Sequence, residues 1–261
     1  MSPVGPESTV ELMAVGAHPD DVELSCGGTL ALAASRGRRV GIVHLTRGEA
    51  GTRGSAEERA AEARCAADAL GAASLDVLDC GDGHLRTGRA EEDALIEVIR
   101  RRRPEVILGP PPRDRHPDHR RAHNLLEAAA FYAGLTGRTL PGDAAGLAPH
   151  RPGAVFYYMQ HNSFDPTFVV DVGDAWEAKK HALACYGSQL QVPGDWGEEG
   201  GDEPPRDEPI TKVATPEFSL AMEGRMRHFG LLIGAALGEP FGSKLPLAVG
   251  DPLDVLPGGV R

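Results

Sequence analysis

The chain has 261 residues, of which 41% are hydrophobic and 25% are charged, and its formal net charge is −11. These values are ordinary for a globular protein with a substantial core, and the negative charge argues against nucleic acid or an anionic membrane as the main partner. No apolar run is long enough to span a membrane and no signal peptide is evident, so we expect a cytoplasmic protein.

The cysteines also fit a cytoplasmic protein. The four cysteines (Cys26, Cys65, Cys80 and Cys185) are scattered through the chain and form no C-x-x-C pair. None has a clear activating partner in the sequence, so a cysteine nucleophile is not indicated. Reduced thiols without disulfides are the expected state.

Strand and helix patterns alternate through the first half of the chain. Residues 1–9 read as a disordered lead-in, and apolar runs then predict buried strands at 10–17, 40–45, 75–78 and 105–108. Helical periodicity covers 22–36, 55–70 and 90–103, and Ser55 with Glu58 forms a capping-box signature. This order predicts an α/β fold, namely a Rossmann-like, doubly wound and mostly parallel sheet with helices on both faces.

Two details of these helices carry expectations of their own. The pair Gly27 and Gly28 inside the first helix predicts that this helix lies close to the sheet. Four arginines at 100–103 close the third helix, where a solvated cationic cap is the expected arrangement.

The second half of the chain is less regular. A helix is predicted to end at about residue 133, followed by strands at 154–160 and 167–172, a helix at 174–188 with Asp174 as its N-cap, and a helix at 216–237. The acidic stretch 191–209 has no periodicity and is predicted to be a mobile surface loop. The Gly/Pro-rich tail from Gly238 is expected to wrap the surface, and residues 1–261 are expected to form a single domain.

Three polar loops follow predicted strands and should meet at one edge of the sheet. They are His18–Asp21, which reads H-P-D-D, the glycine-rich stretch 46–54, and the stretch 113–119, which ends in H-P-D-H. The carboxyl edge of an open α/β sheet is where such folds place their ligands. Together the motifs H-P-D-D and H-P-D-H offer three histidines and three carboxylates, which are His18, Asp20, Asp21, His116, Asp118 and His119.

This set is sufficient for a catalytic metal site with three protein ligands and an open position. Nitrogen and oxygen ligands suit zinc and also allow iron, manganese or cobalt. Taken singly, either loop could instead hold helix-capping aspartates and surface histidines. Other chemistries are weaker, because Ser25 lacks a G-x-S-x-G elbow and no G-x-G-x-x-G follows the first strand.

The motifs A-H-P-D-D at 17–21 and H-P-D-H at 116–119 resemble those of the PIG-L/LmbE family of zinc-dependent N-acetylglucosamine deacetylases. The resemblance extends over nearly the whole chain, except the acidic stretch 191–209. The longer strings at 45–54, 114–119 and 161–166, with F-G-L-L-I-G and G-E-P-F near the C-terminus, are most similar to the bacillithiol-pathway deacetylase. That enzyme type hydrolyses the acetamide of N-acetylglucosaminyl-malate, a linear amide.

The resemblance implies roles for matched positions. His18, Asp21 and His119 would bind the metal, Asp20 would be the general base, and His116 would stabilise the oxyanion or act as general acid. Asp118 would orient His116, Tyr186 would assist the oxyanion, and Arg59, Arg115 and Arg53 would contact substrate. One departure is visible, because Asp114 stands where some relatives have a tyrosine. The resemblance also implies a cytoplasmic homo-oligomer, a trimer or hexamer.

The same residues leave other functions open. The chain could deacetylate another N-acetylglucosamine conjugate, such as the inositol-linked compound of mycothiol synthesis, or act as an amidase on mycothiol or bacillithiol S-conjugates. A non-catalytic sugar- or metal-binding module is an alternative from another class. A nucleotide-binding α/β protein is a further alternative that rests on fold analogy alone.

Overall fold

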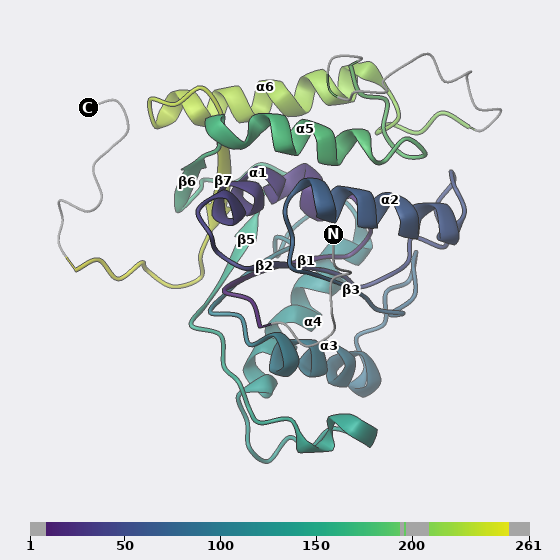
Figure 1. The fold of residues 1–261 in the computed structure, drawn as a ribbon, viewed down its shortest axis with the longest axis vertical. Helices are drawn as coiled ribbons and strands as arrows, with labels where there is room; N and C mark the ends of the chain where they lie inside the picture. Colours follow the sequence, from purple (N-terminus) through teal and green to yellow (C-terminus); the bar gives the residue numbers. More distant parts are fainter. Residues whose placement is uncertain (1–8, 194–195, 197–208, 251–261) are drawn as a thin grey trace.

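The computed structural model of the protein describes residues 9–193, residue 196 and residues 209–250 (Figure 1). The strands are β1 Leu12–Gly16, β2 Val40–His44, β3 Ser74–Val77, β4 Val106–Gly109, β5 Ala154–Tyr158, β6 Phe168–Asp171 and β7 Gly238–Gly242. The α-helices are α1 Asp21–Ser35, α2 Ala56–Ala69, α3 Arg89–Arg102, α4 Pro117–Ala133, α5 Trp176–Ala184 and α6 Pro216–Leu232. Two short 3₁₀ helices are η1 Gly142–Gly146 and η2 Gly173–Ala175.

The seven strands form one sheet in the order β3-β2-β1-β4-β5-β7-β6. The first five strands of this order pair in parallel, whereas β7 is antiparallel to both β5 and β6. The predicted doubly wound, mostly parallel α/β fold is therefore confirmed. Chain order reverses between β1 and β4, so the switch point of the sheet lies between these two strands.

Helices cover both faces of the sheet, as Figure 1 shows. One face carries α3 and α4, and the other carries α1 and α2, with α5 and α6 lying outside them. Each face has its own buried cluster, in which Met13, Val15 and Ile107 point to the α3–α4 side and Ala14, Ile42 and Leu108 to the other. This alternation of neighbouring residues between two cores is what a strand buried on both faces requires. No helix of the described residues is long and apolar enough to cross a membrane.

The end of the chain departs from the prediction. Residues 238–242 do not wrap the surface but form β7, which is buried along its length between β5 and β6, whereas the described residues 244–250 are exposed. The last helix also ends at Leu232 rather than at 237, and Gly234 follows it with a positive φ of 72°. A strand of sequence G-E-P-F-G has no hydrophobic alternation, so its pairing partners and not its own pattern determine its conformation.

Glu239 of β7 explains the glycine pair in α1. Helix α1 is interrupted at Cys26, and the N–H groups of Gly28 and Thr29 beyond the break donate to the Glu239 carboxylate at 2.9 and 2.7 Å. Lys179 of α5 forms a buried ion pair with the same carboxylate at 2.6 Å. A Cβ at Gly28 would lie 2.9 Å from the side chain of Val172, so the predicted close approach occurs at Gly28.

Two helix-terminal predictions are wrong. Asp174 lies inside η2 and is not an N-cap, and α5 starts only at Trp176 and ends at Ala184 rather than at 188. The arginine cluster closing α3 is not simply a solvated cap, because Arg100 and Arg102 are each only 4% exposed. Arg100 donates to the main-chain oxygens of Ala133, the last residue of α4, and of Leu135, and Arg102 pairs with Asp76 at 2.8 Å. Both side chains are enclosed because α3 packs against its neighbours in the fold.

The expectation of four free thiols is also wrong. Cys65 of α2 and Cys185, which follows α5, form a disulfide, while Cys26 and Cys80 are free and buried. The two half-cystines are 120 residues apart, so their spacing gives no indication that α2 and the end of α5 meet. Most of the predicted lead-in 1–9 and of the predicted loop 191–209 lies outside the described residues.

Candidate active site

The two H-P-D motifs meet at the carboxyl edge of the sheet, at its switch point. His18 follows β1, and the segment that leads from β4 into α4 brings His116 and His119 beside it. The parallel pairing of β1 with β4 places these two segments together. They line a cavity of about 610 Å³, to which the stretch 50–52 and the start of α6 also contribute.

Three imidazoles form the centre of this cavity. The ligand nitrogens of His18, His116 and His119 lie within 4.8 Å of one another. Asp21 lies between two of them, with one carboxylate oxygen 3.2 Å from His119 Nε2 and the other 3.4 Å from His18 Nδ1. Three imidazole nitrogens and one carboxylate are a donor set that fits a tetrahedral zinc ion or a related divalent metal.

Asp114 is the group that holds this arrangement, and its side chain is fully buried. Its carboxylate accepts hydrogen bonds from His119 Nδ1 and from the main-chain N–H of His116, both at 3.0 Å, and from the N–H of His161 at 2.9 Å. A carboxylate on the far nitrogen of an imidazole fixes the ring so that its other nitrogen faces a metal. Asp114 thus orients His119 from the position where some relatives have a tyrosine.

Carboxylates shift the pKa values of the two buried histidines. Burial lowers the pKa of His119, but Asp21 and Asp114 outweigh it and raise that pKa to about 9. Burial likewise opposes protonation of His18, yet Asp118, Asp21 and Asp82 hold its pKa well above the usual range. The surroundings of these rings therefore favour positive charge, whether it is carried by protons or by a cation.

The contact between Asp118 and His116 differs from the predicted one, in which the Asp118 carboxylate orients His116. The Asp118 carboxylate accepts from the N–H of Leu85 at 3.0 Å and lies 3.7 Å from His18 Nε2, so it faces His18 and not His116. It is the main-chain N–H of Asp118 that donates to His116 Nδ1, at 3.2 Å. His116 is thereby the N-cap of α4, and burial together with nearby His18 and His119 lowers its pKa.

Asp20 stands in the cavity wall on a left-handed backbone with φ 98°. This conformation is uncommon for a residue with a Cβ and is found mainly where the surroundings enforce it. Its side chain makes no capping hydrogen bond to α1, so the helix-cap alternative does not account for it. Burial raises the pKa of Asp20 to about 7 despite the opposing charge of Arg59, whose Nη2 lies 3.8 Å away.

The three predicted arginines occupy different environments. Arg59 lines the cavity but is only 4% exposed, and it donates to the main-chain oxygens of Gly48 and Pro19. Arg115 is exposed and lines the cavity. Arg53 is not among the lining residues, and its Nε donates to the main-chain oxygen of Ser188 at 2.8 Å.

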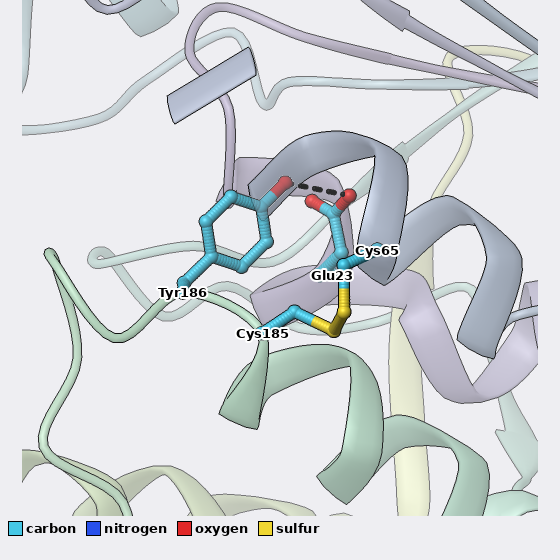
Figure 2. Close-up of a disulfide and its surroundings, with 4 residues drawn as sticks. All are labelled: Glu23, Cys65, Cys185 and Tyr186. Carbon is cyan, nitrogen blue, oxygen red and sulfur yellow. Dashed lines mark hydrogen bonds between the residues drawn. A yellow bond between two sulfur atoms is a disulfide. The ribbon is translucent and has the colours of Figure 1, made fainter. Parts of the chain in front are cut away.

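Tyr186 does not reach the cavity. It is fully buried, and Figure 2 shows its hydroxyl directed at Glu23 of α1, to which it donates at 3.0 Å. Burial and the Glu23 carboxylate raise the pKa of Tyr186 well above its usual value. The buried position of Tyr186 does not fit a direct contact between its hydroxyl and an oxyanion. The disulfide between the adjacent Cys185 and Cys65 anchors this part of the chain to α2 (Figure 2).

Several residues of the site carried no predicted role. Asp82 lies 3.0 Å from His18 Nε2, and Gln160 donates to Asp21 at 2.8 Å. Asp114 and His161 lie in the strings 114–119 and 161–166 that carry the resemblance, and Asp82 follows the predicted strand 75–78, so a position after a strand is the signal that all three share. Gln160, at the end of a predicted strand, and Arg225, on a helix far along the chain, carried no such signal.

Comparison with known proteins identifies the family. The family model described as PIG-L, GlcNAc-PI de-N-acetylase, matches residues 13–130, which include both H-P-D motifs. A diacetylchitobiose deacetylase from Thermococcus kodakarensis is 33% identical over 190 residues, covering 69% of this chain and 70% of the relative. The chain belongs to the PIG-L family. It is an enzyme of the deacetylase type, a hydrolase of amide bonds.

Other relatives sharpen the picture of the PIG-L family. A 1D-myo-inositol 2-acetamido-2-deoxy-alpha-D-glucopyranoside deacetylase from Saccharopolyspora erythraea is 32% identical over 237 residues, with 69% of this chain and 78% of the relative covered. A 4-oxalmesaconate hydratase from Pseudomonas putida is 30% identical over 194 residues, with 68% and 73% covered. The crystal structure of the conserved protein TT1542 from Thermus thermophilus superimposes with a TM-score of 0.79 and 34% identity, covering 94% of this chain and 98% of that one.

Proposed function

We propose that the chain is a zinc-dependent deacetylase of an N-acetylglucosaminide, and that its substrate is N-acetylglucosaminyl-malate, converted to glucosaminyl-malate in bacillithiol synthesis. The observation that carries the proposal is the convergence of His18, His116 and His119 within 4.8 Å, beside Asp20 and Asp21, in one cavity. The deacetylase relatives support the reaction type. The malate aglycone rests on the resemblance of the longer sequence strings.

In this proposal His18, Asp21 and His119 hold the metal. When bound there, zinc lowers the pKa of a water molecule and polarises the acyl carbonyl. Asp114 donates no proton but keeps the Nδ1–H of His119 engaged, so that Nε2 is the nitrogen available as a ligand. Asp82 and Asp118 lie 3.0 and 3.7 Å from His18 Nε2, and their charges favour a positive charge on that ring.

Asp20 is proposed as the general base. Its carboxylate lines the cavity next to Asp21 and is not consumed by a helix cap. A pKa near neutrality makes it able both to accept a proton from water and to return it to the departing amine. Arg59, 3.8 Å from Asp20, keeps part of the carboxylate population ionised at neutral pH.

His116 is proposed to stabilise the oxyanion. Because its Nδ1 accepts the N–H of Asp118, the ring proton of neutral His116 is placed on Nε2, which makes that atom a hydrogen-bond donor. The ring lines the cavity and is about half-buried, so the donor can reach a bound acyl group. Such a donor supports the tetrahedral intermediate of amide hydrolysis.

The test is a substrate panel with two readouts. The zinc-loaded protein is incubated with N-acetylglucosaminyl-malate, the inositol-linked N-acetylglucosaminide and diacetylchitobiose, and both acetate and free amine are measured. A deacetylase releases the two products in equal amounts. We expect the malate compound to give the highest kcat/KM. A higher kcat/KM for the inositol compound would instead support the mycothiol-type reaction, for which the Saccharopolyspora relative is named.

No acetate from any of the three compounds would overturn the deacetylase proposal. The hydratase relative provides the competing chemistry, because a 4-oxalmesaconate hydratase adds water to its substrate. Consumption of 4-oxalmesaconate, without acetate release from the panel, would establish that alternative.

A further inference from the structure

One face of α6 forms a wall of the active-site cavity. Phe218, Ala221, Met222 and Arg225 all line it. Their spacing of three and four residues places them on one face of a helix. Glu217 at the start of the helix also lines the cavity, so the α6 wall runs from a carboxylate through an apolar stretch to the Arg225 cation.

Arg225 is a partly buried cation that forms no ion pair among the described residues. Its Nη1 donates to the main-chain oxygen of Gln160, and among the described residues no carboxylate lies within ion-pair distance of it. Glu239 and Asp114 influence it only at longer range, and burial lowers its pKa. Burial of an ionised group without a close counter-ion is unfavourable, so such a group is expected where a ligand supplies the charge.

Arg59 in the same cavity shows the contrast. Its guanidinium donates to the main-chain oxygens of Pro19 and Gly48 and lies beside Asp20. The charge of Arg59 is thus used within the protein, to hold a loop and the Asp20 carboxylate. The guanidinium of Arg225, in contrast, donates to one main-chain oxygen, and the Arg225 side chain lines the cavity.

Gln160 links Arg225 to the proposed metal site. The main-chain oxygen of Gln160 accepts from Arg225, and its side-chain amide donates to Asp21 at 2.8 Å. Arg225 is therefore one residue removed from a proposed metal ligand. In an N-acetylglucosaminide the acetamide is on the carbon next to the one that carries the aglycone, so an aglycone lies close to the amide that reacts.

We propose that Arg225 determines specificity by binding a carboxylate on the aglycone of the substrate. A guanidinium fork matches a carboxylate with two parallel hydrogen bonds, and the apolar stripe of Phe218 and Met222 packs against the adjoining carbon atoms. This inference rests on the proposed function, and it assigns to Arg225 a contact that the sequence analysis gave to Arg59, Arg115 and Arg53.

The test compares two substrates that differ only in the aglycone. Arg225→Gln and the wild type are assayed on N-acetylglucosaminyl-malate and on the neutral methyl N-acetylglucosaminide of the same anomer. We expect kcat/KM for the malate compound to fall about a hundredfold, mainly through KM, with a change of less than about threefold on the methyl compound. Arg225→Lys keeps the charge without the fork, and we expect about a tenfold loss confined to the malate compound.

Arg227→Gln is the matched control, because Arg227 lies on the same helix but is 62% exposed and pairs with Glu223. It should leave both activities unchanged. Equal losses on the two substrates in Arg225→Gln, or no loss on the malate compound, would overturn the inference. If Arg225→Gln does not fold, judged by circular dichroism and zinc content, the substrate dependence of Arg225→Lys decides by the same criterion. Absence of acetate from both substrates in the wild type would instead contradict the proposed function.

Discussion

The two halves of the sheet contribute to the cavity in different ways. The half made of β1 to β4, in which all strands are parallel, supplies short loops in which His18, Asp20 and Asp21 follow one strand and His116 and His119 follow another. The half containing β5, β6 and β7 supplies Gln160 and, through α6, the wall that ends in Arg225. In the proposed function the first half holds the reacting groups by strand ends and local hydrogen bonds, whereas the second is positioned by contacts between distant segments. Gln160 joins the two halves, because its side chain donates to Asp21 and its main-chain oxygen accepts from Arg225.

The strongest test of the first half is Asp20→Asn. This change keeps the shape of the side chain but removes the base, so we expect kcat to fall about a thousandfold while one zinc ion per chain is retained. Turnover is measured by acetate release, and zinc by elemental analysis. Asp21→Asn is the informative comparison, since it should lose zinc as well. Full activity in Asp20→Asn, or exchange of these two phenotypes, would show that the assignment of the two aspartates is wrong.

The second half depends on Glu239, which joins β7 to α1 and α5. Glu239→Gln leaves Lys179 buried without its counter-ion and weakens the cap on Gly28 and Thr29, so we expect the free energy of unfolding to fall by about 3 kcal/mol. Guanidinium unfolding measures this change. Glu223→Gln removes only the exposed pair with Arg227 on α6 and should cost less than about 0.5 kcal/mol. Similar losses in the two variants would contradict the importance of the buried network.

The affinity of the proposed metal site in the first half of the sheet for zinc should depend steeply on pH. The pKa of His119 is about 9 and that of His18 is also raised, so both rings bind protons at neutral pH in the metal-free protein. Zinc must displace these protons, so affinity rises with pH, and the rise becomes less steep above about 9, where His119 loses its proton. With both protons released, the gain is about ten-thousandfold between pH 6 and pH 8. Calorimetry in buffers of different ionisation enthalpy counts the protons, and a pH-independent affinity would contradict the arrangement.

The disulfide ties α2, which carries Arg59, to the end of α5. Replacing Cys65 and Cys185 by serine together should lower the free energy of unfolding by about 4 kcal/mol, because a long loop of the unfolded chain is no longer closed. Urea unfolding of the double variant and of the wild type in dithiothreitol should give the same midpoint. A wild-type midpoint that does not respond to dithiothreitol would contradict this expectation.

The smallest effect is expected at Arg115. Its side chain is exposed at the cavity, so a contact with substrate there is solvated and contributes little. Arg115→Gln should raise KM for N-acetylglucosaminyl-malate about threefold and leave kcat unchanged. Steady-state kinetics next to Arg225→Gln provide the comparison, and a loss at Arg115 as large as that at Arg225 would remove the distinction between the two cations.

The sequence is informative about the parallel half for a physical reason. Apolar runs that end in H-P-D-D and H-P-D-H locate strands, loops and chemistry at once, because proline and the following helix fix where each side chain emerges. Asp20 and Asp21 could be distinguished only by resemblance, and their roles stay predictions. In the second half the signals are long-range. G-E-P-F-G has no strand pattern, Cys65 and Cys185 are 120 residues apart, and Arg225 matches no motif.

The position of β7 also has a consequence for the order of folding during synthesis. This strand is the last of the seven to leave the ribosome, yet it lies between β5 and β6, which are made earlier. Until residue 242 has emerged, those two strands have no central partner, and the broken segment of α1 lacks the carboxylate that caps it. Strand edges that wait unpaired are sites of misassembly. A nascent chain stalled before β7 should therefore be the species of this protein that most requires a chaperone.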